Sequence, residues 1–267
     1  MRRMRAFATI LMILIGAAPP ALAETGFLDR SVSIGGETYR YQVFVPADYT
    51  AERSWPVIVD LHADGAQGND GLLQTARGLA NQIRQRRSEF PAIVVFPQAR
   101  VGARFLAPAA MQDLVIAQLD RTIAEFKGDP ARVYLMGYSM GGASVYRIGY
   151  RWPEKFAALV VIAGFVVPPA RAPAASVTLD QQTNAFAAAS DPFTALANRI
   201  GKIPIWIYQG DADQTVPVDQ ARRMVTALKA VASPIRYTEG AGIDHLASAQ
   251  NGYADPQMVA WLFAQQR

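Results

Sequence analysis

Near its middle the sequence reads Gly137-Tyr138-Ser139-Met140-Gly141-Gly142. The apolar run Val133–Met136 before this motif predicts a buried strand, and the spacing of Gly141–Arg151 after it predicts a helix. A Gly-x-Ser-x-Gly motif between a strand and a helix is typical of a nucleophile elbow, a tight and strained turn. Its flanking positions need small residues, because side chains there would meet neighbouring backbone. The turn would lift the Ser139 hydroxyl above the sheet and let the Met140 N–H face a developing oxyanion.

A serine with an ordinary pKa is a weak nucleophile and needs a general base. The chain has two histidines, His62 and His245. His62 ends the apolar run Val57–Leu61 early in the chain, whereas His245 follows the last predicted strand. Folds with this elbow place serine, acid and histidine in that chain order, which selects His245 as the base. We expect His62 to support its own loop by hydrogen bonding.

The acid is expected on the loop after the predicted strand Ile203–Tyr208, where Asp211 and Asp213 lie. Active sites of open α/β sheets form at the edge where the carboxyl ends of the strands lie, and this loop follows such an end. One of the two carboxylates would accept a hydrogen bond from the imidazole and hold its tautomer, while the other shapes the turn. Asp244 is a third candidate, but it adjoins His245, and neighbouring side chains on an extended loop diverge.

A second oxyanion donor is expected in the loop His62–Asp70, which follows Val57–Leu61 and is called the oxyanion loop below. The backbone N–H of Asp64 is the candidate for this second donor. Together with the Met140 N–H, it would complete a pair of donors for an oxyanion.

Strand-like and helix-like segments alternate along the chain after residue 30. Two runs around Gly35-Gly36-Glu37 predict a hairpin, and Asp129-Pro130 predicts a turn. The predicted strands are Ser31–Ile34, Tyr39–Val45, Val57–Leu61, Ala92–Phe96, Val133–Met136, Leu159–Ala163, Ile203–Tyr208 and Ile235–Glu239. The predicted helices are Gly71–Arg87, Met111–Lys127, Gly141–Arg151, about Val218–Val231 and about Pro256–Gln266.

This alternation predicts an α/β fold, with a mostly parallel sheet, an N-terminal antiparallel hairpin and helices on both faces. The segment Phe165–Lys202, rich in proline and alanine, interrupts the pattern. We expect a small insertion there, at about residues 165–202, that forms either a lid or irregular packing.

The composition excludes several classes of protein. Hydrophobic residues make up 51% and charged residues 18%, which is too apolar for an extended disordered chain. Three of the 26 basic residues and none of the 22 acidic residues fall in residues 1–23, which leaves 23 against 22 and argues against a nucleic-acid binder. The absence of cysteine excludes disulfides, thiolate metal sites and a cysteine nucleophile.

The N-terminus is typical of an export signal. Residues 1–23 combine a basic start, the apolar stretch Ala6–Ala18, two prolines and the small-x-small sequence Ala21-Leu22-Ala23. An uncleaved membrane anchor is the rival interpretation, but Pro19 and Pro20 shorten the helical part of the stretch. We therefore expect a cleaved signal peptide over residues 1–23, a single domain over residues 24–267, and a secreted or periplasmic location.

Several motifs, taken together, carry a family resemblance over nearly all of residues 30–267. They are the oxyanion loop, Phe90–Gln98, Asp129–Tyr134, the elbow, Pro153–Ala158 and Ile203–Gly210. In these motifs the chain resembles the α/β-hydrolase superfamily, and within it a secreted bacterial group of predicted peptidases and esterases. That group is related to polyhydroxybutyrate depolymerases and to feruloyl or acetylxylan esterases. The resemblance implies that the catalytic serine, acid and base are Ser139, Asp213 and His245.

Two positions depart from this family. The oxyanion loop has His62-Ala63 and the acid loop has Gln209-Gly210, where the family usually has His-Gly. Alanine at position 63 would be unfavourable if that position required a positive φ. The Asp64 carboxylate would oppose a developing negative charge unless it points away. Both departures are expected to lower efficiency more than to abolish activity.

The function that follows is a secreted serine hydrolase that cleaves carboxylic esters through an acyl-enzyme. We expect no metal or organic cofactor. The expected partner is a small-molecule or polysaccharide-linked ester substrate, with no nucleic acid and, after signal cleavage, no membrane. A serine peptidase of the same fold is one alternative. A non-catalytic periplasmic binding protein on a degenerate hydrolase fold is the other.

Overall fold

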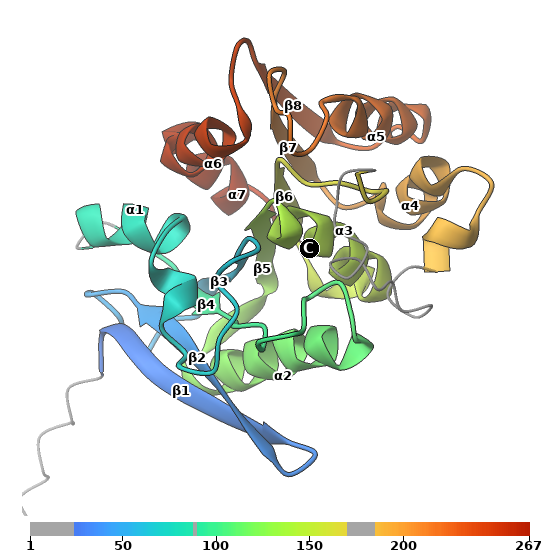
Figure 1. Ribbon diagram of the computed structural model, residues 1–267. Coiled ribbons are helices and arrows are strands. Elements are labelled where there is room, and N and C mark those ends of the chain that lie inside the picture. The colour runs from blue at the N-terminus through green and yellow to red at the C-terminus, as the bar shows by residue number, and fades with distance from the viewer. Residues whose placement is uncertain (1–23, 88–89, 170–184) are drawn as a thin grey trace, which may run out of the picture.

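The computed structural model describes residues 24–87, 90–169 and 185–267 (Figure 1). The predicted signal peptide, residues 1–23, lies outside the described residues, as do residues 170–184 of the predicted insertion. Within the described part of the chain, no helix combines the length and the apolar character that a bilayer crossing requires.

One eight-stranded sheet runs through the described residues in the order β1-β2-β4-β3-β5-β6-β7-β8 (Figure 1). The first two strands pair as an antiparallel hairpin, β2 pairs antiparallel with β4, and all later pairs are parallel. The strands are β1 (Gly26–Ile34), β2 (Glu37–Val45), β3 (Trp55–Leu61), β4 (Ile93–Phe96), β5 (Gly128–Tyr138), β6 (Ala158–Ile162), β7 (Ile205–Gly210) and β8 (Ile235–Gly240). The predicted mostly parallel sheet with an antiparallel N-terminal hairpin is therefore confirmed.

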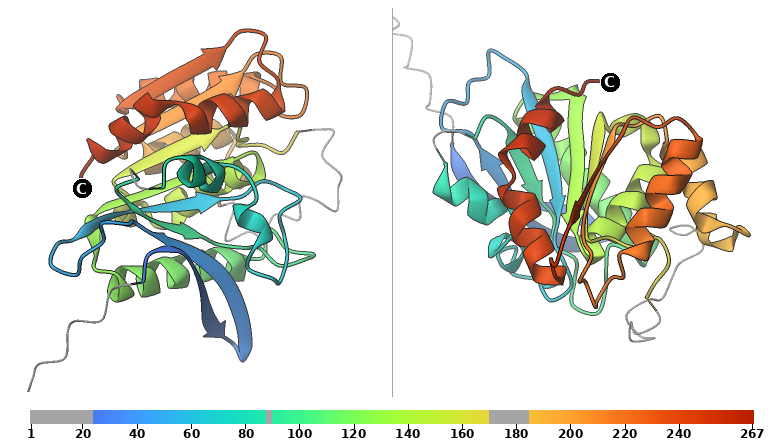
Figure 2. Two further views of the ribbon diagram at one scale, coloured as in Figure 1. Left: turned by 90° about the vertical axis from the view of Figure 1, so that its left-hand side faces the viewer. Right: turned by 90° about the horizontal axis from the view of Figure 1, so that it is seen from above.

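Helices cover both faces of this sheet (Figure 2). The α-helices are α1 (Leu79–Gln85), α2 (Ala109–Glu125), α3 (Met140–Arg151), α4 (Pro192–Ile200), α5 (Asp219–Ala230), α6 (His245–Ala254) and α7 (Pro256–Phe263). Buried side chains of α2, α3, α4 and α5 share one apolar cluster with the sheet, and those of α1, α6 and α7 share the other. The short 3₁₀ turns η1 (Leu73–Thr75), η2 (Pro153–Lys155) and η4 (Ala185–Ala188) lie between these elements.

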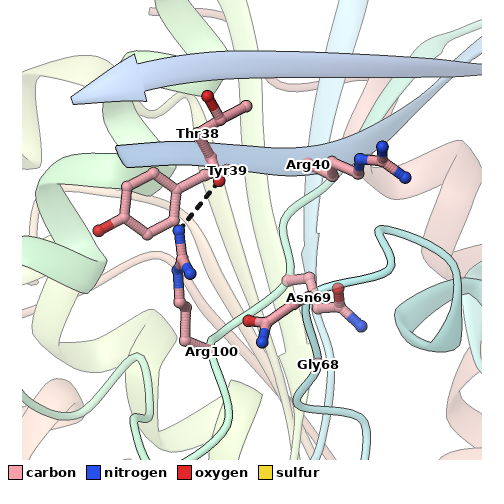
Figure 3. Close-up of a pocket in the computed structure, with 7 residues that line it drawn as sticks. Thr38, Tyr39, Arg40, Gly68, Asn69 and Arg100 are labelled. Carbon is pink, nitrogen blue, oxygen red and sulfur yellow. Dashed lines mark hydrogen bonds between the residues drawn. The ribbon is translucent and has the colours of Figure 1, made fainter. Parts of the chain in front are cut away.

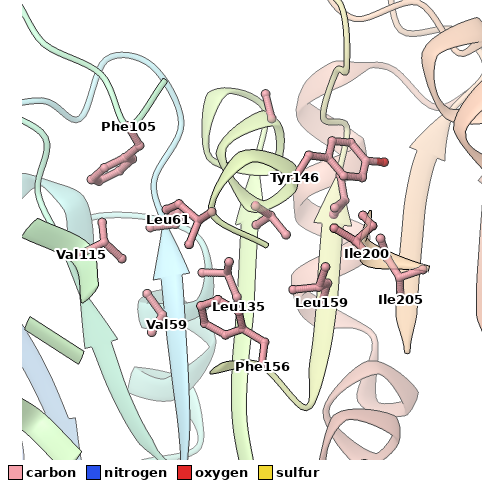
Figure 4. Close-up of a cluster of buried hydrophobic side chains, with 14 of the residues drawn as sticks. Val59, Leu61, Phe105, Val115, Leu135, Tyr146, Phe156, Leu159, Ile200 and Ile205 are labelled. Atoms are coloured by element: carbon pink, nitrogen blue, oxygen red, sulfur yellow. The ribbon is translucent and has the colours of Figure 1, made fainter. Parts of the chain in front are cut away.

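Strand β3 shows why the sequences of the central strands are almost entirely apolar. All seven of its residues are buried. Val57, Val59 and Leu61 point into the cluster on one face, whereas Ile58 points into the cluster on the other. Figure 4 shows Val59 and Leu61 beside Leu135 of β5 and Leu159 of β6, with helices packed over them. A strand that is covered on both faces takes apolar residues at nearly every position rather than at alternate ones, and Asp60 is the exception in β3.

Four sequence predictions need correction. Residues 71–87 form the two short elements η1 and α1 instead of one helix, and Gly78, with a φ of 69°, separates them. The predicted turn Asp129-Pro130 is extended and belongs to β5. His245 begins the helix α6 and does not lie on an extended loop. Within the described part of the insertion, α4 packs regularly through buried Phe193, Leu196 and Ile200, which corrects the expectation of irregular packing there, whereas the lid alternative stays a prediction.

Candidate active site

The elbow around Ser139 lies between β5 and α3, as the motif predicts. Ser139 has a φ of 55° and a ψ of −116°, a conformation in which a non-glycine residue is strained. A Cβ on Gly141 would lie 1.9 Å from the Leu61 carbonyl oxygen, and a Cβ on Gly137 would lie 2.6 Å from the Gly141 carbonyl carbon. The two flanking glycines are therefore required because backbone, which cannot move aside, occupies the space.

Ser139, His245 and Asp213 lie within hydrogen-bonding distance of one another in series. The Ser139 Oγ is 2.9 Å from the His245 Nε2, and the His245 Nδ1 is 2.6 Å from the Asp213 Oδ2. In the neutral tautomer with the proton on Nδ1, the ring donates to Asp213 and accepts from the Ser139 hydroxyl. The structure thus brings together the three side chains that the sequence favoured as nucleophile, base and acid.

Asp213 is held in its ionised form by the donors around it. Burial alone would raise the pKa of this carboxyl, but the hydrogen bond from His245 and those from the Val216 and Thr215 N–H groups lower it. The two backbone donors each lie 2.8 Å from Oδ1. A carboxylate with these partners stays charged at neutral pH and can stabilise an imidazolium on His245.

Gln209 fills the position at which the family usually has histidine. Its side chain is fully buried, and its Nε2 donates to the Asp213 Oδ2 at 2.9 Å and to the Val216 carbonyl at 3.0 Å. The glutamine therefore ties both ends of the acid loop together. This departure from the family pattern supports the carboxylate instead of displacing it.

The other two aspartates considered as acids have backbone partners. Asp211 accepts from the Gly242 N–H at 2.6 Å, which shapes the turn as expected. Asp244 accepts from the Ala247 N–H at 2.7 Å and is the N-cap of α6. Because Asp244 caps that helix, the residue after it starts the first turn, which fixes where His245 enters the site.

Tyr138 is a contact of the site that the sequence analysis missed. Its hydroxyl donates to the His245 carbonyl oxygen at 3.0 Å, and the two rings lie 4.9 Å apart between centroids. The residue occupies the variable position before Ser139 in the motif, where the sequence pattern carries no information on the side chain. Burial raises the pKa of its hydroxyl, so the group remains a donor at neutral pH.

The start of the oxyanion loop lies against the elbow. The Leu61 and His62 carbonyl oxygens occupy the space beside Gly141. His62 is buried; its Nε2 accepts from the Ala99 N–H at 3.1 Å, and its Nδ1 lies 2.7 Å from the Ala63 carbonyl. Burial lowers the pKa of His62 to about 4, so the ring is neutral and supports the loop by hydrogen bonding, as expected.

The departure at Ala63 causes no backbone strain. Among the described residues, the non-glycine residues with a positive φ are Lys127, Ser139, Ala163 and Ala232. Ala63 is not one of them, so its position does not require glycine. The oxyanion donors assigned to the Met140 and Asp64 N–H groups stay predictions. Met140 is the first residue of α3, and the first N–H groups of a helix have no partner within it.

No group of three or more His, Asp or Glu side chains is placed to hold a metal ion in the part of the chain that the structure describes. The described residues offer a serine, a histidine and a carboxylate in one hydrogen-bonded series. This set can carry out acyl transfer.

Comparisons with known proteins agree with the fold described above. A family model described as "Putative esterase" matches residues 31–261. A thermostable esterase of known structure is 27% identical, with a TM-score of 0.73; the match covers 90% of this chain, which spans only 63% of that protein. No curated protein matches the chain.

Two further solved structures share the fold. A fluorophosphonate-binding serine hydrolase of Staphylococcus aureus has a TM-score of 0.68 at 15% identity, with 90% of this chain and 99% of that protein covered. A ferulic acid esterase of Anaeromyces mucronatus, solved with ferulic acid, has a TM-score of 0.62 at 15% identity, with 92% and 95% covered. At this identity the likeness concerns the fold alone.

Proposed function

The chain belongs to the family described as "Putative esterase", within the α/β-hydrolase fold, and we propose that it is a serine esterase that cleaves carboxylic esters. Ser139 attacks the ester carbonyl while His245 accepts its proton, and Asp213 orients the imidazole and stabilises its charged form. The Met140 and Asp64 N–H groups hold the oxyanion. The alcohol leaves with the proton from His245, and a water activated by the same ring releases the acid from the acyl-enzyme.

The observation that carries this proposal is the unbroken hydrogen-bonded series from Ser139 to Asp213. Its two distances, 2.9 Å and 2.6 Å, lie within the range expected of a nucleophile with its base and of a base with its orienting acid. A serine in a surface turn without this series would have no group to take its proton. The strained φ of Ser139 adds a feature that clusters at functional sites.

The proposed substrates are small-molecule or polysaccharide-linked carboxylic esters, met after export to the periplasm or the cell exterior. The basic and apolar pattern of residues 1–23 supports the proposed export. The ferulic acid esterase with the same fold supports the proposed ester class. A peptidase would use the same three side chains, so a choice between ester and amide substrates requires a direct comparison.

A fluorophosphonate probe tests the proposed nucleophile. Wild-type protein should be labelled and should hydrolyse aryl esters, whereas Ser139→Ala should do neither. Ser33→Ala removes an exposed serine from the β1–β2 hairpin and serves as the matched control, which should label like the wild type. Folded wild-type protein that neither labels nor hydrolyses esters would favour the binding-protein alternative. Faster cleavage of peptides than of esters would favour the peptidase.

A further inference from the structure

A carboxylate beside an oxyanion site is unfavourable unless another charge compensates it. Asp64 lies two residues after His62, whose carbonyl borders the elbow glycine Gly141. Two residues of chain span at most about 7 Å, so the Asp64 Cα lies close to the elbow. A unit charge within about 10 Å of a developing oxyanion, at an effective dielectric constant of about 20, changes the rate on the order of tenfold. The partners of Asp64 therefore matter for the reaction.

Arg104 binds both oxygens of this carboxylate. The Arg104 Nε lies 3.0 Å from Oδ1 and its Nη2 lies 3.1 Å from Oδ2, the paired geometry in which a guanidinium best matches a carboxylate. Gln67 also donates to Oδ1 through its Nε2, and its Oε1 accepts from the Gly65 N–H at 2.7 Å. The carboxylate therefore points toward hydrogen-bond donors within and beside the oxyanion loop. Although burial alone would raise its pKa, the hydrogen bonds from Arg104 and Gln67 lower it, so that Asp64 stays ionised.

The backbone of Arg104 is fixed in a closed turn that packs beneath the same loop. The Arg104 N–H donates to the Ala107 carbonyl at 3.0 Å, and the Ala107 N–H donates back at 3.1 Å. Phe105, next in the chain, is fully buried, and its ring lies 4.8 Å from the His62 ring. Burial of Phe105 therefore holds the guanidinium at the oxyanion loop before any substrate binds.

Resting on the proposed esterase function, we propose that Arg104 is a positioning residue that neutralises Asp64 and fixes the oxyanion loop for the developing negative charge. Arg104 acts through Asp64 and does not touch the substrate. The pair lets an aspartate occupy a position beside the oxyanion site without opposing catalysis. Arg104 is 24% exposed and Asp64 50%, so the pair contributes little to stability, and its effect is expected in the rate.

The connection between β4 and α2, which contains Arg104, also supplies a matched control. Arg100 lies 3.3 Å from Glu37, and the exposures of 30% and 60% are close to those of the first pair. Figure 3 shows Arg100 directed at β2, where it donates to the Thr38 carbonyl at 2.9 Å and its guanidinium lies 4.2 Å from the centre of the Tyr39 ring. Arg100 therefore carries the same charge, four residues earlier, but pairs with the hairpin and not with the oxyanion loop.

The test compares kcat and KM for an activated aryl ester, together with thermal unfolding. Arg104→Gln should lower kcat about tenfold with KM changed by less than about twofold, because the uncompensated charge acts on the transition state. Adding Asp64→Asn to this variant should restore most of the lost kcat, and Asp64→Asn alone completes the cycle. Arg104→Lys keeps the charge and should lose less than Arg104→Gln. Arg100→Gln should stay within about twofold of the wild type.

The outcomes separate this inference from the proposed function. An Arg104→Gln variant as fast as the wild type would overturn the role of Arg104 and leave the esterase proposal standing. A double variant no faster than Arg104→Gln would also overturn it, because the effect would then not run through Asp64. Equal losses in Arg100→Gln and Arg104→Gln would indicate a general charge effect and contradict the proposal. Wild-type protein that shows neither labelling nor ester hydrolysis would overturn both.

Discussion

Among single residues, Asp213, the proposed acid, is held by more than its contact with His245. Asp213 gains two backbone donors from the loop that follows it and an amide donor from Gln209. These contacts fix the direction of Oδ2, the oxygen that faces the imidazole. They also explain why one aspartate of the Asp211–Asp213 pair serves the ring, whereas the other accepts from the Gly242 N–H.

We predict that Asp213→Asn lowers kcat by about 10³–10⁴-fold, because an amide donor at this position favours the wrong imidazole tautomer. The measurement is steady-state hydrolysis of an aryl ester near neutral pH. Asp211→Asn is the matched control on the same loop; it should stay within about threefold, since an asparagine oxygen can still accept from the Gly242 N–H. Comparable losses in both variants would contradict the assignment of the acid.

Some residues of the candidate site could be predicted from the sequence, and others could not. Two histidines and the chain order of serine, acid and histidine left one candidate base, so the contact of His245 with Ser139 could be predicted from the sequence. The choice of Asp213 over Asp211 needed the family resemblance, because both residues lie on the same loop. Arg104 could not be predicted, since its partner lies 40 positions away and the two meet through tertiary packing, which includes the contact of Phe105 with His62.

Among the elements, helix α6 connects the proposed base to the centre of the sheet. His245 is its first residue, and Tyr253 near its end donates to Asp60 of β3 at 2.8 Å. Asp60 is buried, and burial raises its pKa from an ordinary 3.8 to about 7, although the hydrogen bonds from Tyr253 and the Leu79 N–H oppose this rise. Below about pH 7, a protonated Asp60 therefore lies beneath the helix that begins with His245.

This buried acid predicts a pH-dependent stability. Between pH 4 and pH 7, roughly, the folded state keeps a proton on Asp60 that the unfolded chain has released, so this group's contribution to the free energy of unfolding falls as pH rises. Asp60→Asn removes the titration. The free energy of unfolding of Asp60→Asn minus that of the wild type should therefore increase across this window and level off beyond it. Urea unfolding of both proteins at several pH values measures the difference.

Tyr253→Phe is the companion variant. Its loss of a donor to Asp60 should raise the pKa of that carboxyl further, so the decline of stability should extend to higher pH than in the wild type. A difference between Asp60→Asn and the wild type that stays constant with pH would show that Asp60 is already ionised in the folded protein.

Helices α4 and α6 were not predicted from the spacing of apolar residues. The buried positions of α6 are Ser248, Ala249, Gly252 and Tyr253. Because most of these residues are small or polar, the sequence of α6 lacks the apolar spacing that predicts a buried helix face. Helix α4 begins with Asp191 as N-cap and Pro192 in its first turn, a start signal that the surrounding proline-rich and alanine-rich sequence obscured. Apart from β1 and β5, the strands were predicted to within three positions, and so were the helices α2, α3, α5 and α7.

At the scale of the whole molecule, the parallel sheet gathers distant segments at one edge. The oxyanion loop follows β3, Ser139 follows β5, Asp213 follows β7 and His245 follows β8. The carboxyl ends of parallel strands meet at the same edge, so Ser139 and His245, which are 106 positions apart, come into contact there. Strand alternation in the sequence was sufficient to predict this convergence, whereas distances and partners within the site required the structure.

The most direct test of the central claim is to detect the acyl-enzyme on Ser139. The wild-type protein would be mixed with an activated aryl acetate, quenched in acid during the burst, digested and examined by mass spectrometry. An acetyl group is expected on the peptide that contains Ser139, and it should be lost over time as water releases acetate. Ester turnover without an adduct on that peptide, or with the adduct on another residue, would contradict the account.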